Sequence, residues 1–255
     1  FMYLFLLQKK LLSVSCVLGS VAFSYSLYMV VWLEWGNVGH TLIWLPLIFL
    51  TIDKLKEKFN IRWLLFYTST LIFTILAGYI QLIIYIFLLT FFYYLHQHFN
   101  ANNLQRFIKK SFLIGLFTLL AIGICSFQLL PGMEIYIQSA RNIYSEAAIS
   151  KLLMPWYSAI TLFIPDFFGN PAYRNYWLEG TYIERVSYVG IIPLIFAVYG
   201  ILCRKKGMIF YGIAVFVSLL LAINFFTAQF FYSLQITILG TTVTTRILIV
   251  LSFSI

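Results

Sequence analysis

Long apolar segments follow one another along nearly the whole chain, and they constrain its fold more than any other feature of the sequence. A membrane-spanning helix needs about 20 mostly apolar residues, because the hydrocarbon core of a bilayer is about 30 Å thick. The chain is 62% hydrophobic and only 10% charged, whereas soluble domains are about 45–50% apolar and about 25% charged. So few polar residues cannot cover so much apolar surface in water. The sequence therefore predicts an integral membrane protein.

The apolar runs predict an all-α, polytopic transmembrane helix bundle of about eight segments, about six of them complete. Both ends stop inside apolar sequence, so we read residues 1–255 as a single transmembrane domain that is a fragment of a longer protein. The expected helices are a truncated one at 1–7, others near 11–33, 37–53, 62–78, 80–96, 111–131, 187–203 and 208–224, and a last one that begins near Thr245.

Charge divides the connections between these helices into two sets. The first set holds twelve of the 17 Lys and Arg residues but two of the 8 acids, and the second holds five basic residues and six acids. Cytoplasmic loops carry an excess of Lys and Arg, so the first set is predicted to be cytoplasmic. Its basic residues are Lys9, Lys10, Lys54, Lys56, Lys58, Arg62, Arg106, Lys109, Lys110, Arg204, Lys205 and Lys206. This topology explains the net charge of +9 without nucleic acid.

The opposite, extracytoplasmic side then holds the distinctive polar sequence. The turn from Gly78 to Gln81 leaves little length for two full spans, so we expect it to lie below the outer surface in a polar recess. Residues 132–186 form the longest non-helical stretch, an extracytoplasmic loop. It should begin with an interfacial amphipathic helix, continue with a re-entrant or interfacial segment at 156–165, and end in an ordered surface loop at 166–188.

Candidate site residues begin in the first outer connection. Glu34, Asn37 and His40 are flanked there by Trp32 and Trp35. They are either interfacial polar residues in an aromatic belt, or Glu34 or His40 faces the cavity as a base or ligand-binding group.

A second candidate pair lies at the start of the long loop. Glu134 and Arg141 are seven residues apart, about two helical turns on the same face. They form either a solvated face or a site for sugar hydroxyls and phosphate, since Arg offers planar bidentate donors.

Further ionisable residues gather near the end of the loop. Asp166, Glu179, Glu184 and Arg185 precede the helix that opens with Tyr188. A carboxylate here is a candidate general base or a ligand for a divalent cation, the only cofactor that the sequence suggests, and the alternative is structural ion pairing.

Arg246 opens the last apolar segment. Its side chain is expected either to snorkel to the interface or to pair with an anionic lipid phosphate.

The order and spacing of short outer-face motifs along nearly the whole chain resemble the bacterial YfhO-like membrane proteins, a family of polytopic GT-C type glycosyltransferases. The matching series is Gly39-His40, Trp44-Leu45-Pro46-Leu47, Ala77-Gly78 with Gln81, Gln128-Leu129-Leu130-Pro131 with Glu134, Pro165 to Gly169, Tyr188-Val189-Gly190 with Pro193-Leu194, and Arg246. Family members often have His-Pro where this chain has Tyr79-Ile80, a departure at the recessed turn.

The resemblance implies a location in the bacterial cytoplasmic membrane and transfer of a sugar from a polyprenyl-phosphate-linked donor to a cell-envelope polymer or glycolipid. The family's usual catalytic carboxylate would lie in an outer loop before Phe1. In this chain the expected catalytic residues are Glu184, His40 and Glu134. The expected substrate-binding residues are Arg141, Arg185, Arg246, Gln81, Tyr188 and Asp166.

Two other functions remain open from the sequence. A transporter or flippase for a lipid-linked or anionic solute would use the same arginines. It should carry charged or broken helices at mid-membrane depth, and the central parts of the predicted helices hold no Asp, Glu, Lys or Arg. A non-catalytic membrane scaffold would tolerate every outer-face substitution.

Overall fold

The computed structural model describes residues 1–99, 101–139, 153–203, 207–234, 236, 238–239 and 242–255. These residues form two compact units, which are described separately. Unit 1 consists of Phe1–Ser20 and Trp35–Gln138, and unit 2 of Val21–Glu34 and Ser139–Ile255. Within the described ranges the chain is helical and has no β-strand, only an isolated bridge between Met154 and Ile223. The all-α class is therefore confirmed there, and the single transmembrane domain stays a prediction.

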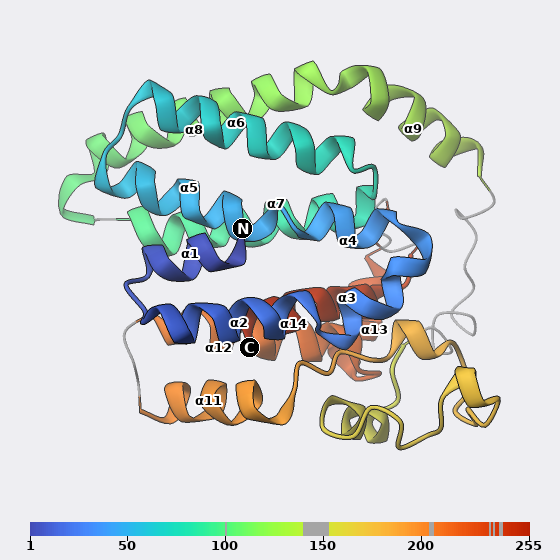
Figure 1. The fold of residues 1–255 in the computed structure, drawn as a ribbon. Helices are drawn as coiled ribbons and strands as arrows, with labels where there is room; N and C mark the ends of the chain where they lie inside the picture. Colours follow the sequence, from blue (N-terminus) through green and yellow to red (C-terminus); the bar gives the residue numbers. More distant parts are fainter. Residues whose placement is uncertain (100, 140–152, 204–206, 235, 237, 240–241) are drawn as a thin grey trace. The chain divides into compact units, whose positions relative to one another are not determined.

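Unit 1 is built around helix α5 (Figure 1). Ten of the 13 residues of α5 are buried, and the helix packs against α1, α6 and α7. Pro46 lies in its first turn, where a missing N–H costs no hydrogen bond. The helices of this unit are α1 (Met2–Gln8), α4 (Asn37–Leu42), α5 (Leu45–Glu57), α6 (Ile61–Leu76), α7 (Ile80–His98), η2 (Ala101–Asn103), α8 (Leu104–Ile124) and α9 (Ser126–Gln138), and α2 (Ser13–Ser24) contains the boundary with unit 2.

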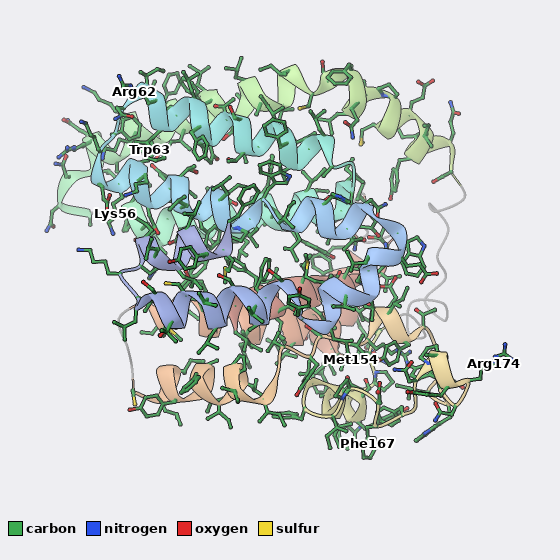
Figure 2. All side chains as sticks on the ribbon, in the orientation of Figure 1. Lys56, Arg62, Trp63, Met154, Phe167 and Arg174 are labelled. Atoms are coloured by element: carbon green, nitrogen blue, oxygen red, sulfur yellow. The ribbon has the colours of Figure 1, made fainter. Side chains whose placement is uncertain are left out.

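The basic connections of unit 1 meet at one end of its helices. Lys56 donates to Gln97 (3.0 Å), and the Lys110 ammonium lies 5.2 Å from the centre of the Phe59 ring. Lys9 forms an ion pair of 2.7 Å with Asp53, which is 7% exposed. Figure 2 shows Lys56 and Arg62 at this end. The structure thus gathers the basic loops of unit 1 as the charge pattern predicts, and their cytoplasmic location stays a prediction.

Unit 2 combines short helices with a long ordered loop. All seven residues of α14 are buried, and this helix packs against α12 and α3. The helices of the unit are α3 (Leu27–Val31), η1 (Trp32–Trp35, whose last residue belongs to unit 1), η4 (Trp156–Leu162), η5 (Pro171–Tyr173), η6 (Tyr182–Glu184), α11 (Ile191–Leu202), α12 (Met208–Ala222), α13 (Phe226–Ser233), η7 (Thr244–Ile247) and α14 (Leu248–Ser254).

Several helices are apolar enough to cross a membrane. Among the described residues, three have sufficient length, and a fourth span results if the bent pair α2 and α3–η1 is counted as one. The three long helices are Asn37–Glu57, Ile80–His98 and Ala101–Ile124. Shorter apolar helices are Ile61–Leu76, Ile191–Leu202, Met208–Ala222 and Thr244–Ser254. Membrane-helix character is therefore present, and the count of about eight segments stays a prediction.

The expected continuous helix at 11–33 is wrong. The chain bends by 41° between α2 and α3. At the bend the hydroxyl of buried Ser26 donates to the carbonyl of Phe23 (2.9 Å), and the Leu27 amide donates to the carbonyl of Tyr188 (2.7 Å). These non-helical hydrogen bonds satisfy the polar groups that an interrupted helix releases. Apolar periodicity does not reveal such partners.

Other helix boundaries also differ from the expectation. The helix predicted at 111–131 is replaced by α8, which begins at Leu104, and α9, with Cys125 between them. The helix predicted at 187–203 begins only at Ile191, because Gly190 has a φ of +102°, a backbone conformation outside the helical region. Helix α13 was not predicted, since eight residues are too few for a membrane span.

Candidate functional site

The most strongly organised charged pair of unit 2 joins Glu184 and Arg246. The two Oε atoms of Glu184 accept from the guanidinium, with Nη2 2.7 Å from Oε1 and Nε 3.1 and 3.2 Å from Oε1 and Oε2. Their side chains are only 11% and 15% exposed. Charge-assisted, multiply bonded contacts of this kind fix the orientation of a guanidinium.

Helix α3 and the turn after it complete the surroundings of Arg246. The guanidinium carbon lies 5.4 Å from the centre of the Trp32 ring, and the Tyr28 hydroxyl donates to the carbonyl of Arg246 (3.2 Å). A cation over an indole face is attracted by the negative charge of the ring face. The Arg246 guanidinium is therefore held by a carboxylate and an aromatic ring of unit 2.

Arg185, the residue after Glu184, is 4% exposed. Gly180 has a φ of +91°, and a Cβ atom there would lie 2.6 Å from Nη2 of Arg185, so the absence of a side chain makes room for the guanidinium. Burial lowers the pKa of Arg185, and the neighbouring Tyr176, Tyr157 and Glu179 act in the opposite direction. This arginine is packed into the loop that carries Glu184.

Asp166 organises the loop between η4 and η6. Its Oδ1 accepts from the Tyr182 hydroxyl (2.8 Å) and from the side-chain Nδ2 of Asn170 (3.0 Å). Burial, together with the hydrogen bond to Asp166, raises the pKa of Tyr182, so this hydroxyl stays a donor well above the ordinary titration range of tyrosine. The Phe168 and Trp177 rings pack edge to face, 5.0 Å apart. The described part of this segment consists of turns and short 3-10 helices, and the extracytoplasmic surface loop stays a prediction.

Tyr188 contributes to the fold of unit 2 through its backbone. Its carbonyl receives the amide of Leu27 at the helix bend, and its side chain is half-buried. The preceding residue, Ser187, shares a hydrogen bond of 2.6 Å with Ser252 on α14. A direct substrate contact by Tyr188 stays a prediction.

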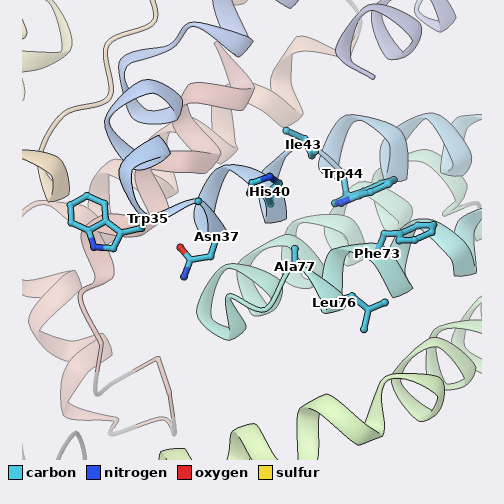
Figure 3. A pocket seen from close by; sticks show the side chains of 9 residues that line it. Trp35, Asn37, His40, Ile43, Trp44, Phe73, Leu76 and Ala77 are labelled. Atoms are coloured by element: carbon cyan, nitrogen blue, oxygen red, sulfur yellow. The ribbon is translucent and has the colours of Figure 1, made fainter.

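The remaining expected site residues lie in unit 1 or outside the described residues. His40 is exposed and lines a cavity of about 480 Å³ (Figure 3). Gln81 is buried and donates to the Tyr85 hydroxyl (3.1 Å), whereas Glu134 is exposed on α9. Arg141 lies outside the described residues. The structure thus brings Glu184 and Arg246 together, with Arg185, Asp166 and Tyr188 in the same unit, and places His40, Gln81 and Glu134 in the other.

Comparison of this chain with protein-family models, curated proteins and solved structures gives no match. A function can therefore be argued only from the residues of the chain and their geometry.

The carboxylates of the long loop do not form a metal site in the described part of the chain. No three His, Cys, Asp or Glu side chains come close enough there to hold a metal ion. Asp166 and Glu184 instead bind Tyr182 and Arg246. The described residues therefore offer no cluster of three such ligands for a divalent cation, and no chemical step is assigned to one.

Sequence reasoning missed two features of these sites. It considered Trp32 as part of an aromatic belt or as a flank of Glu34 and His40, whereas the structure puts its ring against Arg246. No local signal joins residues so distant in sequence. The second feature is the cavity in unit 1, which the sequence could have indicated. Asn37, His40 and Trp44 are spaced at i, i+3 and i+7 and so lie on one helix face.

Proposed function

We propose that this protein is a membrane glycosyltransferase of the YfhO-like type in the bacterial cytoplasmic membrane. It moves a sugar from a polyprenyl-phosphate-linked donor to an extracytoplasmic cell-envelope polymer or glycolipid. The proposal is supported chiefly by the Arg246 guanidinium, which Glu184 and Trp32 hold in one orientation. A preorganised cation stabilises charge that develops on a leaving phosphate without having to reorganise during the reaction.

The proposed reaction is substitution at the anomeric carbon of the donor sugar. The acceptor hydroxyl oxygen forms the new glycosidic bond, and the bond from the anomeric carbon to the phosphate oxygen breaks. The bonding electrons leave with the polyprenyl phosphate, whose negative charge Arg246 stabilises, with Arg185 as a second candidate. The acceptor proton passes to a general base, a role for which the sequence suggests His40, Glu134 or Glu184.

The geometry distinguishes Glu184 from the other two candidates for the base. Both of its carboxylate oxygens already accept N–H groups of Arg246. A proton acceptor needs an available lone pair directed at the substrate hydroxyl. Glu184 therefore fits the role of a positioning residue for Arg246 better than that of the base.

A flippase for lipid-linked sugars is the second candidate function, and one observation favours it. The bend of 41° between α2 and α3 interrupts an apolar segment. Interrupted helices form the binding sites of many transporters. The two functions predict different fates of the same lipid-linked sugar: transfer to an acceptor by the enzyme, and movement across the bilayer by the flippase.

The deciding experiment uses the purified protein in liposomes with radiolabelled polyprenyl-phosphate sugars and an extract of envelope lipids. Label transferred to acceptor is measured separately from label that crosses the bilayer. We expect transfer, and a loss of about 100-fold in Arg246→Ala, the scale of removing one charge-stabilising donor. The matched control is Arg174→Ala, an exposed arginine of the same loop, which should retain full transfer.

Crossing without transfer would establish the flippase instead. Equal transfer by Arg246→Ala and Arg174→Ala would show that the Glu184–Arg246 pair does not serve the reaction.

A further inference from the structure

The cavity in unit 1 has a composition that points to a particular class of ligand. It opens between two helix faces at the end of the unit away from the basic loops. One face presents Asn37, His40 and Trp44, and the other Phe73, Leu76 and Ala77. Its volume of about 480 Å³ lies within the usual range of about 300–1,000 Å³ for small-molecule sites.

Two polar side chains on the α4 side of the cavity are available for hydrogen bonds. The amide of Asn37 and the imidazole of His40 are exposed. In the part of the chain that the structure describes, neither side chain makes a hydrogen bond. An amide offers both donors and acceptors, and a neutral imidazole offers one of each. This pair suits a ligand with hydroxyl groups, which also donate and accept.

The apolar part of the cavity is aromatic. Trp44 stacks on Phe73 with ring centroids 4.9 Å apart, and Phe1 packs on Trp44 at 5.0 Å. Trp44 is therefore held between two rings. Phe73 is 49% exposed, and its ring can pack against the C–H groups of a ligand. Aromatic faces beside polar groups suit an amphipathic ring better than an alkyl chain.

The charge of the lining excludes other ligand classes. None of the nine lining residues is Lys, Arg, Asp or Glu. A phosphate or carboxylate would lack the cationic partner that such groups usually have in proteins, and a cationic ligand would lack a carboxylate. A hydrocarbon chain would make no hydrogen bond to the amide or the imidazole. The ligand that satisfies all the lining groups is neutral, ring-shaped and rich in hydroxyls.

We infer that this cavity binds a neutral sugar ring, with a C–H face against Phe73 and its hydroxyls bonded to His40 and Asn37. The further assignment of that sugar to the acceptor rests on the proposed function, because the donor sugar carries a phosphate that this cavity does not match. Binding of the ring itself does not depend on that assignment.

The test measures binding in the absence of transfer. The purified protein is placed in lipid nanodiscs, because sugar-based detergents would compete for the cavity. Saturation-transfer NMR then follows methyl β-D-glucopyranoside and other methyl glycosides, with glucose 1-phosphate and cyclohexanol as charged and apolar comparisons. We expect at least one methyl glycoside to bind, and Asn37→Ala or His40→Ala to weaken it about threefold to tenfold, the scale of one hydrogen bond.

The matched controls are Asn103→Ala and His96→Ala, both exposed at the basic end of unit 1, and they should bind the glycoside like the unaltered protein. Equal weakening by cavity and control variants would overturn the inference. So would a cavity that binds glucose 1-phosphate or cyclohexanol as tightly as every methyl glycoside.

Failure of this inference can be told apart from failure of the proposed function. Glycoside binding that depends on Asn37 and His40, without any transfer in liposomes, leaves the cavity assignment intact and overturns the enzyme. Transfer by a protein whose cavity binds no glycoside overturns the cavity assignment and leaves the proposed enzyme activity intact.

Discussion

At the scale of single residues, the contact between Glu184 and Arg246 distinguishes two roles that Glu184 could have in the proposed reaction. A base must be open to the substrate, whereas a positioning group is occupied by the residue that it orients. The nearly buried Glu184 side chain, with both oxygens bonded to one guanidinium, belongs to the second kind. Removal of its charge should therefore act on the reaction through Arg246.

We expect Glu184→Gln to lower the free energy of unfolding by about 3 kcal/mol, because it leaves the half-buried guanidinium without its counter-charge. In a double-mutant cycle with Arg246→Gln, the coupling energy should be at least about 1.5 kcal/mol. Thermal unfolding of the four proteins measures both quantities. The control is Glu34→Gln, an exposed carboxylate of the same unit, for which we expect no measurable change.

The proposed positioning role of Glu184 also has a kinetic signature. If Glu184 only orients Arg246, Glu184→Gln lowers kcat but leaves the acidic limb of the pH–rate profile in place. Disappearance of that limb would identify Glu184 as the base.

At the scale of secondary-structure elements, the turn between α6 and α7 depends on one glycine. Gly78 has a φ of +88°, and a Cβ atom there would lie 3.3 Å from the amide nitrogen of Gln128. Gln128 in turn donates to the carbonyl of Ile75 in the last turn of α6 (3.3 Å). Helix α6 has 16 residues, about 24 Å in length, which is shorter than the bilayer core. This length is consistent with a turn below the outer surface at Gly78 to Gln81, which stays a prediction.

We predict opposite effects for two glycine-to-alanine substitutions. Gly78→Ala should destabilise the protein by about 1–2 kcal/mol, because an L-residue is strained at positive φ. Gly115→Ala in α8 should stabilise it by about 0.5–1 kcal/mol, since Gly115 has no atom within 4 Å of an added Cβ. Unfolding in mixed micelles measures the difference, and equal effects at the two positions would contradict the assignment of the turn.

At the scale of the whole molecule, the exposed surface is largely apolar. Most side chains of α8 are exposed, including Phe112, Leu116 and Leu119. Apolar patches of this extent are rare on monomeric soluble proteins. A bilayer would cover them without any change of fold. The apolar helix surface, rather than the interior, therefore favours a membrane location.

The predicted topology can be tested by cysteine labelling in intact cells. The background is Cys203→Ser, since Cys203 is exposed whereas Cys16 and Cys125 are buried. A membrane-impermeant maleimide should label Ala172→Cys in the long loop from outside. It should label Lys58→Cys in a basic loop only after permeabilisation, because both positions are exposed and differ in the predicted side. The reverse pattern would invert the topology.

The sequence by itself determined the helical class, the apolar character of the helices and the grouping of basic loops in unit 1. These properties follow from composition and local periodicity, which act over one or two helical turns. It also identified Glu184, Arg185 and Arg246 as candidates, but with no means to pair them.

Only the tertiary structure decided the partners. Glu184 and Arg246 are 62 residues apart, and Trp32 comes from a third segment, so their contact depends on how α3, the loop and η7 pack. The bend at Ser26 likewise depends on the Tyr188 carbonyl. The free energy of such contacts arises between segments that are distant in sequence, so no local pattern contains it. Charge and periodicity therefore predicted the helices, whereas packing decided which side chains meet.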